Sequence, residues 1–346
     1  MSLLEALSRS ETIVIAEIAQ AHDGSLGSAH EYIDLIANAG ANAVKFQTHI
    51  AHAESTIREP WRVKMSTSDK TRYEYWQRME FKESEWVELK DHCNSRGLSF
   101  LSSPFSIEAL DLLNRLGVEV WKLASGEVSN TPLVEAMIKT KKPIILSTGL
   151  STWNELDEVV SLILGSDIDL TVLQCTSEYP CPPELTGLNL IQEYKKKWGC
   201  RVGISDHSGT IFPSLAARTL GGSVIEVHIT SSRDSKGVDS PSSITPDELK
   251  VLVNGVKFLD IALANTADKT QLSASAQEMR RIFGRSIVAN SDLEIGHLIQ
   301  KGDLAYKKPG GGLTWKEIGL LIDHKLLKPV SRDELITEEN IIKETK

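Results

Sequence analysis

Residues 202–230 read VGISDHSGTIFPSLAARTLGGSVIEVHIT and contain a complete strand–helix–strand pattern. An apolar run at 202–205 is followed at once by polar residues, and residues 211–220 then have helical periodicity. A second apolar run occupies 223–229. Because neighbouring parallel strands need a crossover connection and are buried on both faces, this segment predicts one βαβ unit of a parallel sheet.

The same alternation extends outward from this unit over most of the chain. Runs that read as strands lie at 13–18, 43–47, 99–103, 118–124, 143–147, 170–175, 202–205 and 223–229. Amphipathic segments lie among or after them at 26–39, 82–96, 107–116, 153–164, 211–220 and 246–264. This pattern predicts the α/β class and a closed (β/α)8 barrel, or TIM barrel. A doubly wound open sheet is the alternative, but GSLG at 24–27 is not a dinucleotide-binding fingerprint.

The pattern changes after the last of these helices. We expect a barrel domain at 1–264, a linker with some helical content at 265–284 and a small, mostly-β domain at 285–346. The small domain should contain strand-like runs at 286–289 and 304–307, a PGGG turn at 309–312 and an amphipathic helix at 314–322. A unit of roughly 60 residues is marginally stable alone, so we expect it to dock on the barrel or on a partner chain.

Composition excludes several classes of protein. The formal net charge is −9, which argues against nucleic acid as a partner. The four cysteines form no CxxC pair, which indicates reduced thiols in a cytoplasmic protein rather than a disulfide scaffold or a zinc site. We expect no secretory leader and no membrane span, because neither an apolar leader core nor a run of about 20 apolar residues is present.

Polar residues follow the predicted strands at their carboxyl ends. In strand order they are Glu17, His22, Asp23; Lys45, Gln47, Thr48, His49; Ser102, Ser103; Lys122, Ser125, Glu127; Ser147, Thr148; Gln174, Thr176, Ser177; Ser205, Asp206, His207; and Glu226, His228, Thr230. Reacting groups of barrel enzymes project from this end of the strands. The sequence therefore predicts an active site at this rim.

Two lysines, Lys45 and Lys122, lie in otherwise apolar strands. A buried lysine must pair with an anion or shift its pKa, and serines at strand–helix junctions offer further donors. The serines in question are Ser103, Ser125, Ser147 and Ser205. Together these residues favour a cradle for a phosphate or carboxylate. Two alternatives remain: the lysines could pair with Glu17 and Glu127, or one could form a Schiff base in an aldolase.

A pair of histidines suggests a metal site. His207 ends the seventh predicted strand and His228 lies in the eighth, so both imidazoles should reach the mouth of the barrel. Neutral imidazole is a common ligand of divalent transition metals. Two ligands would leave positions for water and substrate, which suits Lewis-acid chemistry on a carbonyl.

With these residues in place, the chain resembles the sialic acid synthase (N-acetylneuraminate synthase) family over essentially its whole length. The matching stretches are AEIAQAHDGS (16–25), GANAVKFQTH (40–49), LSSPFS (101–106), WKLASGE (121–127), PIILSTG (143–149), LQCTSEYP (173–180), VGISDHS (202–208), VIEVHIT (224–230) and YKKPGGG (306–312). The resemblance implies condensation of phosphoenolpyruvate with an open-chain hexosamine, such as N-acetylmannosamine or a diacetamido-trideoxy relative. The products would be a nine-carbon 2-keto acid, a nonulosonic acid, and phosphate.

The resemblance also implies a second domain of the antifreeze-like (SAF) type and a domain-swapped homodimer, in which this domain closes the partner's active site. Carried over position by position, it makes His207 and His228 ligands of Mn²⁺ or Mg²⁺. It places Lys45, Gln47, Ser103, Lys122, Ser125, Ser147, Ser177 and Ser205 around phosphoenolpyruvate, and Tyr179, Asp239 and Lys308 around the sugar. Glu17 and Glu127 fall on the catalytic carboxylates: we assign Glu127 to the positive charge that develops at C2 and Glu17 to the base, an assignment that could be reversed.

Three positions depart from the family pattern. Ser177 stands in place of the usual asparagine at the phosphate end, and Lys308 in place of an arginine that contacts the N-acyl group. Ala21 precedes His22 where an asparagine is usual. An ammonium cannot reproduce the planar fork of a guanidinium, so we expect an altered sugar end of the site. The alternatives are another phosphoenolpyruvate-dependent ulosonate synthase, a Schiff-base aldolase, or a non-catalytic sugar-binding or scaffold protein.

Overall fold

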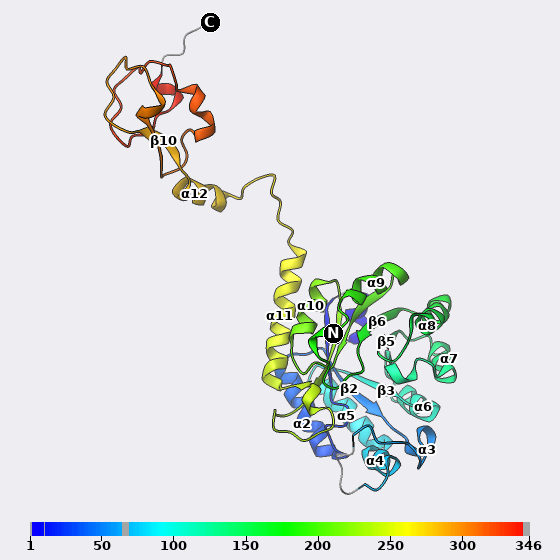
Figure 1. The fold of residues 1–346 in the computed structure, drawn as a ribbon. Helices are drawn as coiled ribbons and strands as arrows, with labels where there is room; N and C mark the ends of the chain where they lie inside the picture. The colour runs from blue at the N-terminus through cyan, green and yellow to red at the C-terminus, as the bar shows by residue number, and fades with distance from the viewer. Residues whose placement is uncertain (1, 10, 64–68, 342–346) are drawn as a thin grey trace. The chain divides into compact units, whose positions relative to one another are not determined.

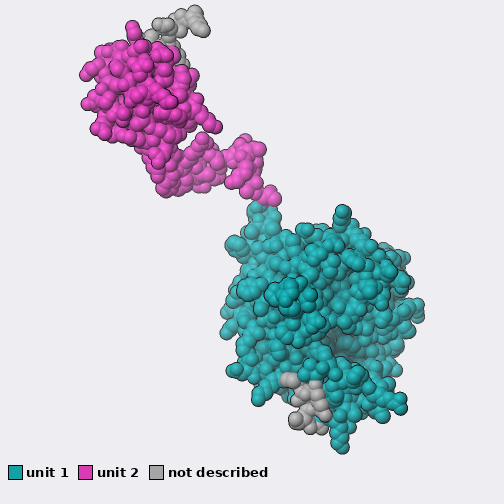
Figure 2. All heavy atoms as spheres, viewed as in Figure 1, with its two compact units in different colours: residues 1–265 teal, residues 266–346 magenta. Residues whose placement is uncertain are grey.

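The computed structural model describes residues 2–9, 11–63 and 69–341. The chain forms two compact units, residues 1–265 and 266–346, which are coloured separately in Figure 2. Residues 342–346, which we expected to end the small domain, lie outside the described residues.

The first unit is a parallel, nearly closed eight-stranded barrel. Its strands are β1 (Ile13–Glu17), β2 (Ala43–Thr48), β3 (Ser99–Pro104), β4 (Trp121–Leu123), β5 (Ile144–Ser147), β6 (Leu170–Cys175), β7 (Arg201–Asp206) and β8 (Val224–Ile229). They are hydrogen-bonded in the order β3-β2-β1-β8-β7-β6-β5-β4, and β3 lies in contact with β4. A short strand, β9 (Ser243–Ile244), adds to β8. The predicted (β/α)8 fold is confirmed.

Helices surround the strands, as Figure 1 shows. They are α2 (Leu26–Ala39), α5 (Glu83–Ser95), α6 (Ile107–Arg115), α7 (Thr131–Lys139), α8 (Trp153–Gly165), α9 (Asn189–Trp198), α10 (Phe212–Thr219) and α11 (Pro246–Ala264). Short helices α1 (Leu3–Ser8), α3 (Ala51–Glu54) and α4 (Arg72–Met79) and 3-10 turns η1 (Ser125–Glu127), η2 (Pro183–Leu185) and η3 (Ser240–Ser242) complete the unit. Ser25, Ser106 and Thr152 cap their helices by accepting a backbone N–H bond, which fixes where each helix begins.

Helix α1 packs on residues near the amino ends of the strands. Leu3, Ala6 and Leu7 form one apolar cluster with side chains such as Ile13 and Val224. The opposite ends of the strands carry the polar residues, so α1 leaves the carboxyl rim free for a site.

Gly203 in β7 is a position where the barrel tolerates no side chain. A Cβ at this residue would lie 1.8 Å from the carbonyl oxygen of Val224 in the neighbouring strand. We expect Gly203→Ala to lower the free energy of unfolding by about 3 kcal/mol or more, because the clash is with backbone. Denaturant titration measures this, with Gly165→Ala as control, since a Cβ there would meet no atom within 4 Å outside the adjacent backbone of its own helix. Equal stabilities of the two variants would contradict the packing described.

The second unit contains a small sheet around its own core. Helix α12 (Ala274–Phe283), in the stretch expected as a linker, precedes β10 (Ser286–Ala289), which pairs antiparallel with β11 (Leu304–Lys307). The 3-10 turns are η4 (Lys301–Asp303), η5 (Trp315–Leu320) and η6 (Glu338–Asn340).

The expected α-helix at 314–322 is instead the 3-10 helix η5. Trp315, Ile318 and Leu321 all pack on the core of this unit. Their spacing of three residues matches the three residues per turn of a 3-10 helix, which explains the difference. Among the described residues of both units, no helix is long and apolar enough to cross a membrane.

Candidate active site

A cavity of about 880 Å³ lies at the carboxyl ends of the barrel strands. Its lining includes Gln20, Gln47, Ser125, Glu127, Ser177, Tyr179, His228 and Asp239, which come from segments at or after β1, β2, β4, β6 and β8. Five of these residues, Gln47, Ser125, Glu127, Ser177 and His228, are rim positions predicted from sequence, and the fold gathers residues from five strands around one space. This cavity is the candidate active site.

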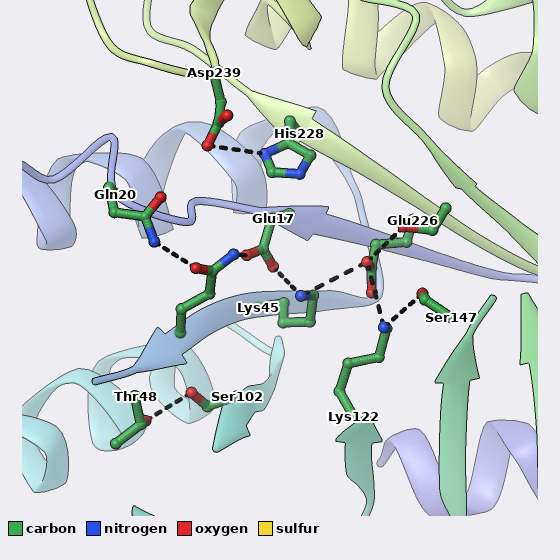
Figure 3. Close-up of polar contacts among 12 residues, drawn as sticks. Glu17, Gln20, Lys45, Thr48, Ser102, Lys122, Ser147, Glu226, His228 and Asp239 are labelled. Atoms are coloured by element: carbon green, nitrogen blue, oxygen red, sulfur yellow. Dashed lines mark hydrogen bonds and ion pairs between the residues drawn. The ribbon is translucent and has the colours of Figure 1, made fainter. Parts of the chain in front are cut away.

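Two lysines and two glutamates form a buried chain of charges, shown in Figure 3. Lys45 Nζ lies 2.6 Å from Glu17 Oε2 and 3.6 Å from Glu226 Oε1. Lys122 Nζ lies 3.8 Å from Glu226 Oε1 and donates to Ser147 Oγ at 2.7 Å. Burial makes each charge dependent on its neighbours. With two ammonium groups and two carboxylates, these four side chains have no net charge. An anionic ligand that binds beside them would therefore meet ammonium groups that are already in place.

The pKa values of this chain follow from burial and from the neighbouring charges. Burial raises the pKa of Glu17 to about 7, against the opposing effect of Lys45. Burial lowers the pKa of Lys122. The pKa of Lys45 is raised although burial opposes it, because Glu17 and Glu226 outweigh the desolvation. With its pKa near 7, the Glu17 carboxyl can exchange a proton near neutral pH.

Several buried oxygens here have no hydrogen-bond partner among the described residues. They include Ser103 Oγ and Glu226 Oε2. Ser103 pairs in register with Gln47 on the neighbouring strand, and Ser205 Oγ donates to Glu226 Oε1 at 3.0 Å. An orphaned hydroxyl costs free energy unless a ligand completes it, so Ser103 fits an anion-binding role.

His207 and His228 are both neutral, which is the protonation state in which imidazole binds a metal. Their ring centroids are 5.2 Å apart, and burial lowers the pKa of both, that of His207 to about 3. His207 Nδ1 lies 2.8 Å from the carbonyl oxygen of Thr176, so it carries the proton and leaves Nε2 as the unprotonated nitrogen, which faces the hydroxyl of Tyr179. No group of three or more His, Cys, Asp or Glu in the described ranges is arranged to hold a metal. Two buried, neutral imidazoles suit a divalent ion that takes its remaining ligands from water and substrate.

Tyr179 and Asp239, which the family resemblance places around the sugar, lie beside the histidines. Tyr179 stacks on His207 at 4.1 Å, and its hydroxyl lies 3.2 Å from His207 Nε2. Asp239 Oδ2 is 4.0 Å from His228 Nδ1. Arg62 pairs with Asp239 and lies 4.3 Å from the Tyr179 ring centroid. Sequence reasoning missed Arg62, because its loop has no periodicity.

Glu127 lies on the cavity wall, away from the lysine pairs. Its Oε2 accepts a hydrogen bond from Asn130 at 2.7 Å, and burial raises its pKa. The alternative in which Glu17 and Glu127 neutralise the lysines is therefore half wrong: Glu17 pairs with Lys45, but the carboxylate beside Lys122 belongs to Glu226. From sequence, Glu226 stands out only as a strand-end residue.

The other predicted residues fall in two places. Ser125 Oγ lies 3.3 Å from Ser177 Oγ at the cavity, so these two hydroxyls are brought together. Lys308 belongs to the second unit, where it is exposed and its Nζ lies 5.4 Å from the ring centroid of Phe283.

Fold and cavity together define a barrel enzyme, and comparison with known proteins identifies its family. Residues 32–268 match the NeuB family and residues 284–342 match the SAF domain. The chain therefore belongs to the NeuB family; it is a synthase of the transferase type with a C-terminal SAF domain.

Relatives cover nearly the whole chain. N,N'-diacetyllegionaminic acid synthase of Campylobacter jejuni is 33% identical over 95% of this chain and 99% of its own length. N-acetylneuraminate-9-phosphate synthase of Homo sapiens is 31% identical, over 94% of this chain and 91% of its own. The crystal structure of N-acetylneuraminic acid synthetase from Leptospira borgpetersenii has a TM-score of 0.68 and 31% identity, and covers 78% of this chain and 90% of its own.

Proposed function

We propose that this protein condenses phosphoenolpyruvate with an open-chain N-acylhexosamine-type aldose, giving a sialic-acid-like nonulosonic acid and phosphate by cleavage of a C–O bond. The acceptor would be N-acetylmannosamine or a modified relative. The observation that carries the proposal is the buried Lys45–Glu226–Lys122 chain with the unpartnered hydroxyl of Ser103. Relatives named for legionaminic, pseudaminic and N-acetylneuraminic-type products support the reaction class and leave the sugar open.

Different residues would bind the two substrates. Phosphoenolpyruvate would bind Lys45, Gln47, Ser103, Lys122, Ser125, Ser147, Ser177 and Ser205, while Tyr179 and Asp239 would hold the sugar. As C3 of phosphoenolpyruvate forms a bond to the sugar aldehyde carbon, the C2=C3 and aldehyde C=O double bonds become single bonds, the aldehyde oxygen takes up a proton, and Glu127 stabilises the positive charge that develops at C2. Glu17 takes a proton from the water that adds at C2. The C2–O bond to phosphate then breaks, and the new C2 hydroxyl loses its proton to become the keto oxygen.

His207 and His228 would hold Mn²⁺ or Mg²⁺. Such an ion would supply Lewis-acid polarisation of the sugar aldehyde. The two neutral imidazoles and the hydroxyl of Tyr179 orient the aldehyde end of the sugar toward the phosphoenolpyruvate site.

The proposal is tested by phosphate release from phosphoenolpyruvate over a panel of hexoses, hexosamines and diacetamido sugars, with and without Mn²⁺. We expect release only with an N-acylated amino sugar and only with a divalent ion. Phosphate release that no sugar stimulates would overturn the proposal.

The pH dependence should report Glu17. Because burial raises the pKa of Glu17 to about 7 and a base must be ionised, kcat/KM should fall as pH falls through neutrality. The measurement is a pH–rate profile at subsaturating phosphoenolpyruvate. A profile that stays flat down to about pH 5 would contradict the assignment of Glu17 as the base.

We further propose that residues 1–264 are the catalytic domain, 265–284 a linker and 285–346 a domain that closes the partner's site in a domain-swapped homodimer and offers Lys308 to the sugar. Truncation after Asn265, where the first compact unit ends, should raise the KM for the sugar at least tenfold and change the KM for phosphoenolpyruvate little. Steady-state kinetics of the purified barrel measures both constants. An unchanged sugar KM would rule out the closing role.

A Schiff-base aldolase is the second candidate, favoured by one observation. Burial lowers the pKa of Lys122, and a neutral lysine is the nucleophile that such enzymes need. Borohydride reduction in the presence of pyruvate and sugar distinguishes the two: a trapped lysine adduct supports the aldolase, and its absence supports the synthase.

A further inference from the structure

His49 and Glu54 form a pair in the wall of the cavity that the proposed chemistry does not use. His49 follows β2 and lies between two aromatic rings, 4.0 Å from Trp76 and 4.5 Å from Phe105 between centroids. Its Nδ1 lies 2.6 Å from Glu54 Oε1, and both residues line the cavity. Phenylalanine could form the same stack, so the ring nitrogens of His49 matter for their hydrogen bonds rather than for the stacking.

His49 Nε2 lies 3.2 Å from both Gln20 Nε2 and Gln47 Oε1. When Nδ1–H of a neutral His49 donates to Glu54, Nε2 accepts from the amide of Gln20, and its contact with Gln47 Oε1 is not a hydrogen bond. The same Gln20 amide donates its other hydrogen to Gln47 Oε1. Gln47 Nε2 is then the end of the amide that faces Glu17, and it donates to Glu17 Oε1 at 2.9 Å. A row of hydrogen bonds thus runs from Glu54 to Glu17; Figure 3 shows its Gln20 and Glu17 ends.

Glu54 is costly to keep in this position. Its side chain is only 8% exposed, and its Oε2 is buried without a hydrogen-bond partner among the described residues. A half-satisfied buried carboxyl destabilises a fold. Its contact with His49 fixes the ring tautomer, as a carboxylate does in a catalytic triad.

We propose that His49 and Glu54 are a positioning pair, which acts through Gln20 to hold the Gln47 amide with its NH₂ group toward Glu17. The proposal rests on the proposed function only in taking Glu17 as the base. If the amide turned over, its carbonyl oxygen would face Glu17 and favour the protonated acid.

Other titratable groups surround both ends of the row. Glu127 from η1 and His22 from the loop after β1 interact with His49. Lys45 from β2 and Glu226 from β8 interact with Glu17. A substitution at His49 removes its interactions with Glu127 and His22 but leaves Lys45 and Glu226, the charged groups that act on Glu17, unchanged.

The test replaces His49 by phenylalanine, which keeps the aromatic stack and removes both nitrogens. The matched control is His52→Phe, because His52 is exposed on the adjacent helix α3. The proton affinity of Glu17 is measured by ¹³C-carboxyl NMR titration, with the resonance assigned by its loss in Glu17→Gln. We expect His49→Phe to raise that affinity roughly tenfold and His52→Phe to leave it unchanged. A Glu17 titration in His49→Phe that matches the wild type overturns the proposal.

A second pair of variants covers the case in which His49→Phe does not fold. Glu54→Gln keeps an acceptor for His49 Nδ1–H, so the proton affinity of Glu17 in this variant should be close to that of the wild type. In Glu54→Leu, which has no such acceptor, the proton affinity of Glu17 should rise as it does in His49→Phe. Equal behaviour of the two variants overturns the proposal. In kinetics, the acid limb of kcat/KM should move to higher pH in the same variants. The NMR titration needs no turnover, so it tests the pair even if no sugar is accepted and the proposed function fails.

Discussion

Replacing His207 or His228 by alanine should abolish metal-dependent turnover and leave the fold intact. Both imidazoles are buried and neutral, His228 lines the cavity and the His207 ring centroid lies 5.2 Å from that of His228; in the proposed site each would supply one protein ligand to the ion. Loss of carbonyl polarisation costs several kcal/mol, so kcat/KM should fall by roughly a thousandfold or more. Steady-state assays with added Mn²⁺ measure the loss, and circular dichroism checks the fold.

The matched control is His52→Ala, since His52 is exposed and does not line the cavity. That variant should keep wild-type activity and metal dependence. Full activity of either His207→Ala or His228→Ala after treatment with a chelator would refute the metal site.

Lys122→Ala should raise the KM for phosphoenolpyruvate about a hundredfold and the KM for the sugar little. The ammonium of Lys122 lies next to Ser147 and Glu226 in a buried setting, where one lost charge contact to an anionic ligand costs about 2 to 5 kcal/mol. Glu226 keeps Lys45 as a partner at 3.6 Å, so the variant retains a compensated carboxylate. Initial-rate kinetics in both substrates gives the two constants.

Lys196→Ala is the control for this change, because Lys196 is an exposed lysine on α9. It should alter neither constant. An equal rise in both KM values for Lys122→Ala would mean that the phosphoenolpyruvate site is not where the lysines are.

Most of the barrel could be predicted from sequence because its strands are buried on both faces and read as continuous apolar runs. Strand β4 is shorter than the run at 118–124, since only Trp121–Leu123 pairs with a neighbour, although Val118 and Val120 are buried. The apolar run at 118–124 therefore predicted burial correctly, but the β-strand that forms within it is shorter than predicted. The 3-10 helix η5 was missed because a short apolar pattern does not distinguish a period of three from 3.6.

The sequence predicted that the site lies at the carboxyl ends of the strands. It did not predict which charged side chains contact one another there. Alternation along a strand places Glu226 on the same face as His228, and the parallel register sets Glu17 beside Lys45 and His228. That period-two signal could have marked Glu226 as an inward-facing residue. No such regularity exists for Arg62, whose position depends on the path of a loop.

The proposed condensation consumes phosphoenolpyruvate with cleavage of its C2–O bond. The direct measurement uses phosphoenolpyruvate labelled with ¹⁸O at the bridging oxygen, incubated with Mn²⁺ and the best acceptor of the sugar panel. We predict that the label appears in the released phosphate, as detected by the isotope shift of its ³¹P resonance. Label retained in the keto acid, with unlabelled phosphate released, would contradict the account.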